Sequence, residues 1–443
     1  MSEQWQNLVD LFPQVLSLIH QGKKADGLAI HKLAQKNGLA IPPWFQGVGR
    51  GFQKCQLKLQ HKLELFCASE MAEMGSSWQV AKARYELLKP HWQKVQVAYL
   101  PCCGAGLDAL HLLSQASGLG YNGSLILSDI YPVAAKMAAY NMAAYKMSDN
   151  NTAAKKMSAY KTAINSAEGN GIQAQVLVED FLQPGHERVP RESYVFLDPA
   201  RRSEGQRLKD DYLPPLKSSM QQLELFLMAQ IKLSPGENIQ ELVMTHPSWS
   251  WTVIQAKGEI KEVCGTYVHP SITNAGSDGV KAIITRDNGE NCYFKQLHHS
   301  LRPEGTGKLK PGQVLALAAP ALVKSQLLED FASHHKLCTY DASPGILLIP
   351  DYQQSPEGPW LDTFTLLGEC SRRPKEIRSL LKPYEGRPLE LRAMGDSSDA
   401  ELMRTLKTYL SQKGSADSRL VLVTVKLGKS RRCLLLESLR NPK

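Results

Sequence analysis

The stretch VQVAYLPCCGAGLDA, residues 95–109, decides the fold class of this chain. A short apolar run leads into a turn that contains Gly104 and Gly106, and a pattern typical of a helix follows at 107–119. A strand, a glycine turn and a helix in this order predict a crossover unit of an open α/β sheet. Glycines let the backbone come close to a nucleotide-like ligand, so Cys103, Gly104 and Gly106 are candidate ligand-binding residues.

The glycine turn alone does not identify the ligand. Gly104-x-Gly106-x-x-Ala109 also fits the pattern of a dinucleotide-binding loop, which leaves an NAD(P)-dependent oxidoreductase open. An ordinary strand–helix turn has similar glycines and remains the other alternative.

Strands and helices alternate after this turn. The second strand covers 124–129, and Pro132 opens the helix that follows it. Such alternation predicts a mostly parallel sheet. The later stretches 259–268 and 280–286 have no helix between them and predict neighbouring strands at an antiparallel edge. The other expected elements are strands at 173–179, 193–197 and 240–246 and a long helix near 212–232.

The remaining segments suggest further domains, because 443 residues exceed one ordinary core. We expect a helical N-terminal region at 1–92, the Rossmann-like domain at 93–290, a small ferredoxin-like linking segment at 291–366 and a small α/β domain at 367–443. A repeat of Ala, Met, Lys and Tyr at 134–161 consists of helix-forming residues and predicts a surface extension of the helix after the second strand.

Acidic residues follow the second and third strands. Asp129 lies 23 residues after Gly106, where a carboxylate can accept hydrogen bonds from ribose hydroxyls, although it could also cap the helix that Pro132 opens. Asp180 and Phe181 end the third strand, where they could contact an adenine amino group and ring. A plain strand end is the alternative there.

The phrase VFLDPARR, residues 195–202, places Asp198 and Pro199 just past the fourth strand, at the sheet edge where ligands bind. A carboxylate there can orient a planar nitrogen or ring carbon toward a methyl group, which a dehydrogenase does not need. We therefore interpret Asp198 and Pro199 as catalytic residues of a methyltransferase. Arg201 and Arg202 could bind a substrate phosphate or form salt bridges within the domain.

Composition limits the cellular setting and the partners. The nine cysteines contain no C-x-x-C pair, and no apolar run approaches the roughly 18 residues of a membrane span. The N-terminus lacks the pattern of a secretory signal, so we expect a cytoplasmic protein without a metal or membrane partner. Residues 371–443 hold 17 Lys and Arg against 8 Asp and Glu, which is the whole net charge of +9. This asymmetry favours an anionic partner, with a solvated basic surface as the alternative.

With these residues identified, the chain resembles the class I S-adenosylmethionine-dependent methyltransferases that carry a C-terminal THUMP-like domain. The resemblance extends from about residue 65 onward. It rests on the C-x-G-x-G-x-D loop at 102–108, Asp129, the triplet 179–181, the phrase 197–202 with LPPL at 213–216, and the tail from 374 to 437.

The resemblance implies a donor site for S-adenosylmethionine and an RNA substrate, because THUMP domains engage tRNA. It adds Asp108 to the donor-binding residues, which are then Cys103, Gly104, Gly106, Asp108, Asp129, Asp180 and Phe181. The basic tail would hold RNA phosphates. No cysteine adjoins Asp198 in the sequence, which favours a base nitrogen over a ring carbon as the acceptor. A catalytically degenerate RNA-binding protein with this fold remains an alternative, and the oligomeric state stays open.

Overall fold

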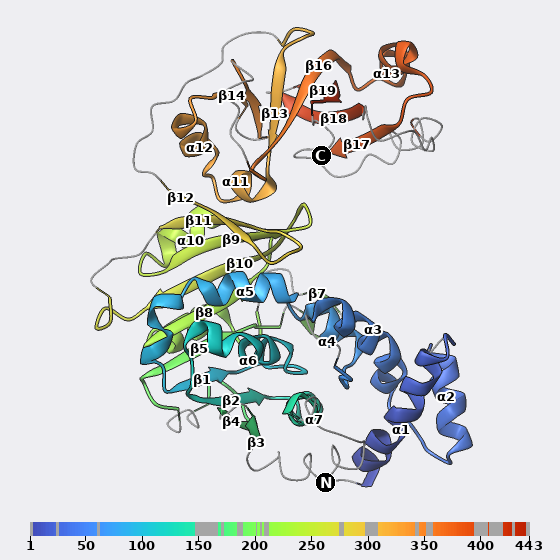
Figure 1. The fold of residues 1–443 in the computed structure, drawn as a ribbon, viewed down its shortest axis with the longest axis vertical. Coiled ribbons are helices and arrows are strands. Elements are labelled where there is room, and N and C mark those ends of the chain that lie inside the picture. The colour runs from blue at the N-terminus through green and yellow to red at the C-terminus, as the bar shows by residue number, and fades with distance from the viewer. Residues whose placement is uncertain are drawn as a thin grey trace. The chain divides into compact units, whose positions relative to one another are not determined.

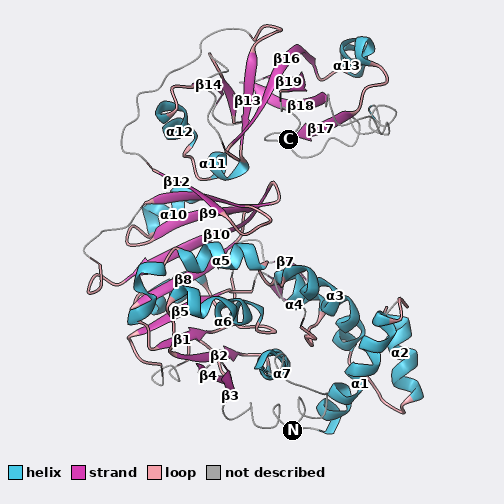
Figure 2. Cartoon of the chain, in the orientation of Figure 1, coloured by secondary structure: helices cyan, strands magenta, loops and turns pink. Residues whose placement is uncertain are grey.

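The computed structural model describes residues 3–23, 26–59, 63–146, 167–169, 172–183, 189–200, 202–203, 206–207, 212–273, 279–296, 309–341, 345–350, 358–393, 406, 420–427 and 430–439. The chain forms two compact units. Unit 1 consists of Met1–Glu237, His246–Ser250 and Glu262–Asp278, and unit 2 consists of Asn238–Thr245, Trp251–Lys261 and Gly279–Lys443. Figure 1 labels the elements, and Figure 2 separates helices from strands by colour.

The N-terminal part is helical, as predicted. Its elements are α1 (Glu3–His20), α2 (Gly27–Lys36), η1 (Pro43–Gly47), α3 (Val48–Lys58), α4 (Ser69–Met74), α5 (Trp78–Glu86) and η2 (Lys89–Lys94). Within the region predicted to be helical, α3 ends at Lys58, and residues 63–68 form no helix. The Asn141 side chain explains part of this interruption, because it accepts a hydrogen bond from Phe66 N (2.8 Å) and donates one to Phe66 O (3.1 Å).

The sheet of unit 1 confirms the predicted mostly parallel α/β architecture. Its strands are β1 (Val97–Leu100), β2 (Ser124–Asp129), β3 (Ala167–Gly169), β4 (Ile172–Val178), β5 (Ser193–Leu197), β8 (Met228–Leu233) and β10 (Glu259–Val268), in the order β10-β8-β5-β1-β2-β4-β3. The five strands from β8 to β4 are parallel, and β10 and β3 pair with their neighbours in antiparallel fashion. The connecting helices include α6 (Leu107–Leu119), α7 (Pro132–Lys146) and α9 (Leu216–Leu223).

Two predicted elements are wrong. The long helix expected near 212–232 is a short α9 followed by β8, whose six residues are all buried. A fully buried central strand shows no alternation, so its sequence resembles that of a buried helix. The strand expected at 240–246 is instead α10 (Ile239–Thr245), in which Ile239 and Leu242 are buried at a three-residue spacing while Met244 is exposed.

The predicted antiparallel edge is also paired differently. β11 (Val280–Thr285) is hydrogen-bonded in parallel to β9 (Ser250–Ala256), a strand that the sequence did not predict, and in antiparallel fashion to β12 (Asn291–Lys295). β10 pairs with β8. The segments 259–268 and 280–286 are therefore both strands, but they are not paired with each other.

Unit 2 contains a second, seven-stranded sheet in the order β14-β15-β13-β16-β19-β18-β17. The boundary predicted between residues 366 and 367 lies inside β16, so the two segments predicted as separate domains contribute strands to one sheet. The elements are β13 (Val314–Ala318), α11 (Pro320–Lys324), α12 (Leu328–His334), β14 (Cys338–Asp341), β15 (Ile346–Leu348), β16 (Leu361–Ser371), α13 (Pro374–Leu381), η5 (Lys382–Tyr384), β17 (Leu389–Ala393), β18 (Leu420–Leu427) and β19 (Ser430–Ser438). Between β17 and β18, Leu406 is the only described residue.

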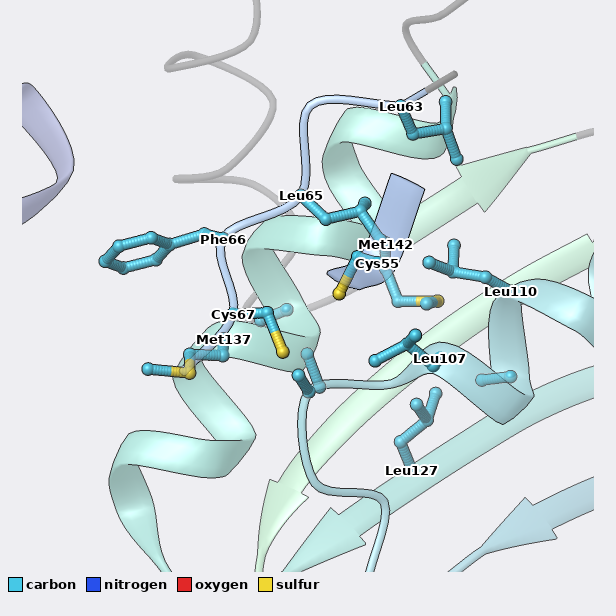
Figure 3. Packing of buried hydrophobic residues seen from close by; sticks show 14 of the residues in the cluster. Cys55, Leu63, Leu65, Phe66, Cys67, Leu107, Leu110, Leu127, Met137 and Met142 are labelled. Carbon is cyan, nitrogen blue, oxygen red and sulfur yellow. The ribbon is translucent and has the colours of Figure 1, made fainter. Parts of the chain in front are cut away.

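The core of unit 1 joins the N-terminal helices to the sheet. Figure 3 shows Met137 and Met142 of α7 among Cys55, Cys67 and Leu107. The described part of the repeat at 134–161 is helical, as predicted, but most of its residues are buried, so it is not a surface extension. Small alanine side chains suit this position because they let α7 pack closely against its neighbours. Residues 147–161 lie outside the described residues.

No helix formed by the described residues is long and apolar enough to cross a membrane.

Candidate active site

The glycine loop follows β1 and leads into α6. Cys103 N donates a hydrogen bond to Ser128 O (2.9 Å), which ties the loop to β2. Cys102, Gly104 and Gly106 have φ angles of 55°, 53° and 80°, in the left-handed region that side chains disfavour. A positive φ at the non-glycine residue Cys102 marks backbone strain, which proteins tend to place at functional sites.

The two predicted glycines have different roles. A Cβ atom at Gly104 would meet no other atom within 4 Å, and Gly104 lines the cavity described below. A Cβ atom at Gly106 would lie 3.3 Å from Ala138 Cβ and from Met142 Cε. Gly106 does not line that cavity. Gly104 therefore leaves room for a ligand, whereas Gly106 lets α7 pack against the loop.

Asp129 lies at the end of β2 and fastens the glycine loop. Its Oδ2 accepts a hydrogen bond from Gly104 N (2.9 Å), and its Oδ1 accepts one from Tyr131 N (2.9 Å). Burial raises the pKa of Asp129, although these two hydrogen bonds oppose the increase. Each carboxylate oxygen has a second lone pair. Asp129 can therefore hold the loop and still accept hydrogen bonds from two vicinal hydroxyl groups.

The residues after β4 form the next part of the site. Asp180 Oδ1 accepts a hydrogen bond from Leu182 N (3.0 Å), and Glu179 accepts one from the Tyr99 hydroxyl (3.1 Å). Phe181 is buried and its ring lies 6.3 Å from that of Tyr99. These contacts fix the turn, and Asp180 and Phe181 both line the cavity.

Asp198 and Pro199 follow β5 on the other side of the glycine loop, and both line the cavity. Asp198 Oδ2 lies 2.6 Å from Lys232 Nζ. Two residues further on, Ala200 exchanges two backbone hydrogen bonds with Leu213 (2.8 and 3.0 Å). This pairing brings the segment Leu213–Pro215, whose first peptide bond is cis, to the cavity beside Pro199.

The two predicted phosphate-binding arginines are not tested by the structure. Arg201 lies outside the described residues. Arg202 belongs to β6 (Arg202–Ser203), which pairs with β7 (Gln206–Arg207), and its side chain is not described.

Asp108 lines the cavity, but its carboxylate contacts Arg84. Arg84 is fully buried, also pairs with Glu262 (Nη1–Oε1 2.9 Å), and lies over the Phe196 ring at 4.0 Å. Burial would raise the pKa of Asp108, but the attraction of Arg84 above all holds it well below its usual range. Residues 84, 108 and 262 are far apart in the sequence, and no spacing rule predicts their ion pairs.

These segments surround one cavity of about 490 Å³ at the carboxyl ends of β1, β2, β4 and β5. In open α/β sheets this edge is the usual place for a ligand. Met71, Met74 and Gly75, in and just after α4, form part of the wall, which the sequence did not predict. Among the described residues, no group of three or more His, Cys, Asp or Glu side chains is placed to hold a metal ion.

The cavity also contains two cysteines, although no cysteine adjoins Asp198 in the sequence. Cys102 and Cys103 line it together with Asp198. Burial, followed by the charges of Asp129, Asp198 and Asp180, raises the pKa of the Cys102 thiol far above its usual value. A thiol in this environment stays protonated at neutral pH and is a poor nucleophile.

Comparison with known proteins agrees with this geometry. No family model matches the chain. Two curated relatives from Mycobacterium tuberculosis, strains CDC 1551 and H37Rv, are each named an uncharacterized S-adenosylmethionine-dependent methyltransferase. Each is 24% identical over 303 residues, which are 68% of this chain and 71% of the relative. A crystal structure of a candidate methyltransferase from Porphyromonas gingivalis W83 matches with a TM-score of 0.60 and 14% identity, over 90% of this chain and 92% of that chain. The chain therefore has the fold of this structure and is similar in sequence to the two relatives.

Proposed function

We propose that this chain is an S-adenosylmethionine-dependent methyltransferase that acts on a nitrogen atom of an RNA base. The observation that supports this proposal most strongly is the single cavity that unites Gly104, Asp129, Phe181 and Asp198 at one edge of the sheet. The names of the two mycobacterial relatives support the same donor.

The residues of the cavity fit the parts of the donor. Gly104 leaves space for the backbone to approach the ligand, and Asp129 can accept hydrogen bonds from both ribose hydroxyls. Asp180 and Phe181 are suited to an adenine amino group and ring. The donor supplies a methyl group already activated on a sulfonium, so the chain itself needs to orient the acceptor and exclude water.

Asp198 is the residue that would orient the acceptor. Its carboxylate can accept a hydrogen bond from an N–H group, which turns the nitrogen lone pair toward the methyl group. The new N–C bond forms as the S–C bond breaks with its electrons on sulfur, and the nitrogen then loses one proton to water.

The state of Cys102 argues against carbon methylation through a covalent thiol adduct. Such a reaction needs a thiolate, and the cavity keeps the Cys102 pKa well above its usual value. A nitrogen acceptor needs no nucleophile from the protein.

A basic face on α13, continued by the first residue of η5, supports RNA as the substrate. Lys375, Arg378 and Lys382 are exposed and recur at three- and four-residue steps, away from the buried Ile377 and Leu381. We call these three cations the α13 basic face. None of the three has an ion-pair partner within the described part of the chain, so they are available to phosphates.

Other arginines of the basic tail are already paired with carboxylates. Arg387 lies 2.5 Å from Glu437, Arg392 lies 2.8 Å from Asp362, and Arg432 contacts Glu369. Fewer cations are therefore free to bind RNA than the net charge of the tail suggests. The α13 basic face is the part of the tail that we expect to contact phosphates.

Calorimetry and nucleoside analysis test the proposal together. We expect the purified chain to bind S-adenosylmethionine and S-adenosylhomocysteine, and one methylated nucleoside to disappear from the RNA of cells that lack the gene. Reduced nicotinamide cofactor should not bind, which an absorbance titration checks. Donor binding with no change in any nucleoside would refute the RNA substrate. RNA binding without donor binding would instead favour a degenerate RNA-binding protein.

A further inference from the structure

Unit 1 contains a network of buried charges directly behind the cavity. It joins cations from the N-terminal helices and β8 to carboxylates of α6, of β10 and of the residue that follows β5. Its members are Lys58, Arg84, Asp108, Asp198, Lys232 and Glu262. Burying a lysine is costly unless its charge is paired and its donors are used. The partners of Lys232 therefore indicate what this residue does.

Lys232 connects two parts of the cavity wall. Its ammonium lies 2.6 Å from Asp198 Oδ2 and donates a second hydrogen bond to Met74 O (2.6 Å). The register of the parallel pair β5–β8 places Leu197 opposite Ile231, so Asp198 and Lys232 come next to each other where the two strands end. The Lys232 side chain is 5% exposed and that of Asp198 is 20% exposed. Lys232 thus approaches Asp198 from the protein interior, and Asp198 faces the cavity.

The charges around Lys232 keep it protonated. Burial alone would lower its pKa, but Asp198, Asp108 and Glu262 together raise it, against the opposing charge of Arg84. Lys58 belongs to the same network: burial, and then the charge of Lys232, lower the pKa of Lys58. Asp198 therefore always has a cation on its inner side.

We propose that Lys232 is a positioning residue for Asp198 in the methyl transfer assigned above. Its ammonium occupies Oδ2 and leaves Oδ1 to receive the hydrogen bond of the methyl acceptor. Its bond to Met74 O couples the same carboxylate to the N-terminal wall of the cavity. This inference rests on the proposed function and narrows it, because a carboxylate held in this way selects acceptors that carry an N–H donor.

Two donor analogues report on this arrangement without a known acceptor. Sinefungin carries an amine where the donor carries its methyl group, and S-adenosylhomocysteine carries neither. Calorimetry gives the affinity of each analogue. The ratio of the sinefungin affinity to the S-adenosylhomocysteine affinity, which we call the sinefungin preference, measures how strongly the cavity binds a cationic N–H group at the position of the methyl group. We expect Lys232→Met to raise the preference for sinefungin on the order of tenfold, because the Asp198 carboxylate loses its ammonium partner and both of its oxygens become available to the amine.

The other variants separate this effect from a loss of structure. Asp198→Asn should lower the sinefungin preference, and the double variant should equal Asp198→Asn, because Lys232 acts through Asp198. Lys58→Met is the matched control. It removes another lysine, whose Nζ donates hydrogen bonds to Glu73 O and to Gly75 O of the cavity wall and which, among the described contacts, makes none with Asp198. It should change both affinities alike.

A sinefungin preference in Lys232→Met that equals or falls below that of the wild type would overturn the inference, even if Asp198→Asn behaves as expected. If Lys232→Met does not fold, Lys232→Gln removes the charge and keeps a donor, and the same increase is expected. Wild-type protein that binds neither analogue would overturn the proposed function and this inference with it.

Discussion

Replacing Gly104 by alanine should weaken donor binding while the fold loses only the energy of a strained backbone. The added methyl group would meet no protein atom within 4 Å, so the folded state bears only the strain of alanine at a φ of 53°. Left-handed backbone costs a non-glycine residue about 1–2 kcal/mol. The methyl group would enter the space beside the loop where the donor must approach, and we expect the donor affinity to fall by a factor of about 10 or more.

Gly106→Ala is the matched control, and it should lower the stability of the fold while it leaves the donor affinity nearly unchanged. The backbone strain is of the same order at a φ of 80°, but the new Cβ would lie 3.3 Å from Ala138 Cβ and Met142 Cε. Overpacking of this kind costs about 1–3 kcal/mol, so we expect a total loss of about 2–5 kcal/mol in the free energy of unfolding. Gly106 does not line the cavity, so the affinity of the folded protein should change little.

Thermal unfolding with and without donor, together with calorimetry, distinguishes the two variants. A ligand at 100 times its Kd stabilises the folded state by about 2.7 kcal/mol, and Gly104→Ala should lose much of this gain at the same donor concentration. Equal donor affinity in the wild type and Gly104→Ala would refute our account of the loop. So would a greater loss of stability in Gly104→Ala than in Gly106→Ala.

Three further results are expected. Cys102→Ser should keep methyl transfer to total RNA within about threefold of the wild type, because a thiol of raised pKa is not the nucleophile; a loss of 100-fold would contradict nitrogen methylation. Changing all three residues of the α13 basic face to glutamate should weaken RNA binding and reduce the slope of log K against log salt concentration by about 3, with donor affinity unchanged as the control. Burial lowers the pKa of His111 from 6.5 to about 4, so the unfolded state binds more protons between these values and stability falls as the pH falls through this window. The free energy of unfolding, measured in urea, should fall by about 3 kcal/mol across this window. His111→Gln keeps a donor for Ser76 O and should make the free energy of unfolding depend less on pH. An unchanged pH profile in this variant would show that another group is responsible.

The local signals of the sequence were reliable where one residue pattern fixes one element. β1, β2, β4 and β5 lie within a residue or two of the predicted strands, because each ends in a glycine or acidic turn that marks its boundary. β8 and α10 were misassigned because a buried strand and a short helix both show runs of apolar residues. The pairing of β11 with β9 could not be predicted from the sequence either, since strand order depends on contacts between distant segments.

The sequence by itself determined the α/β class, the glycine loop and the carboxylates that follow successive strands, because these depend on neighbours along the chain. Tertiary structure alone decided that Gly104 faces the cavity and Gly106 faces α7, since both have a positive φ and they differ in what lies beside them. It also decided the partner of Asp198. Lys232 lies on another strand, 34 residues later, and the register of two parallel strands brings their charges together.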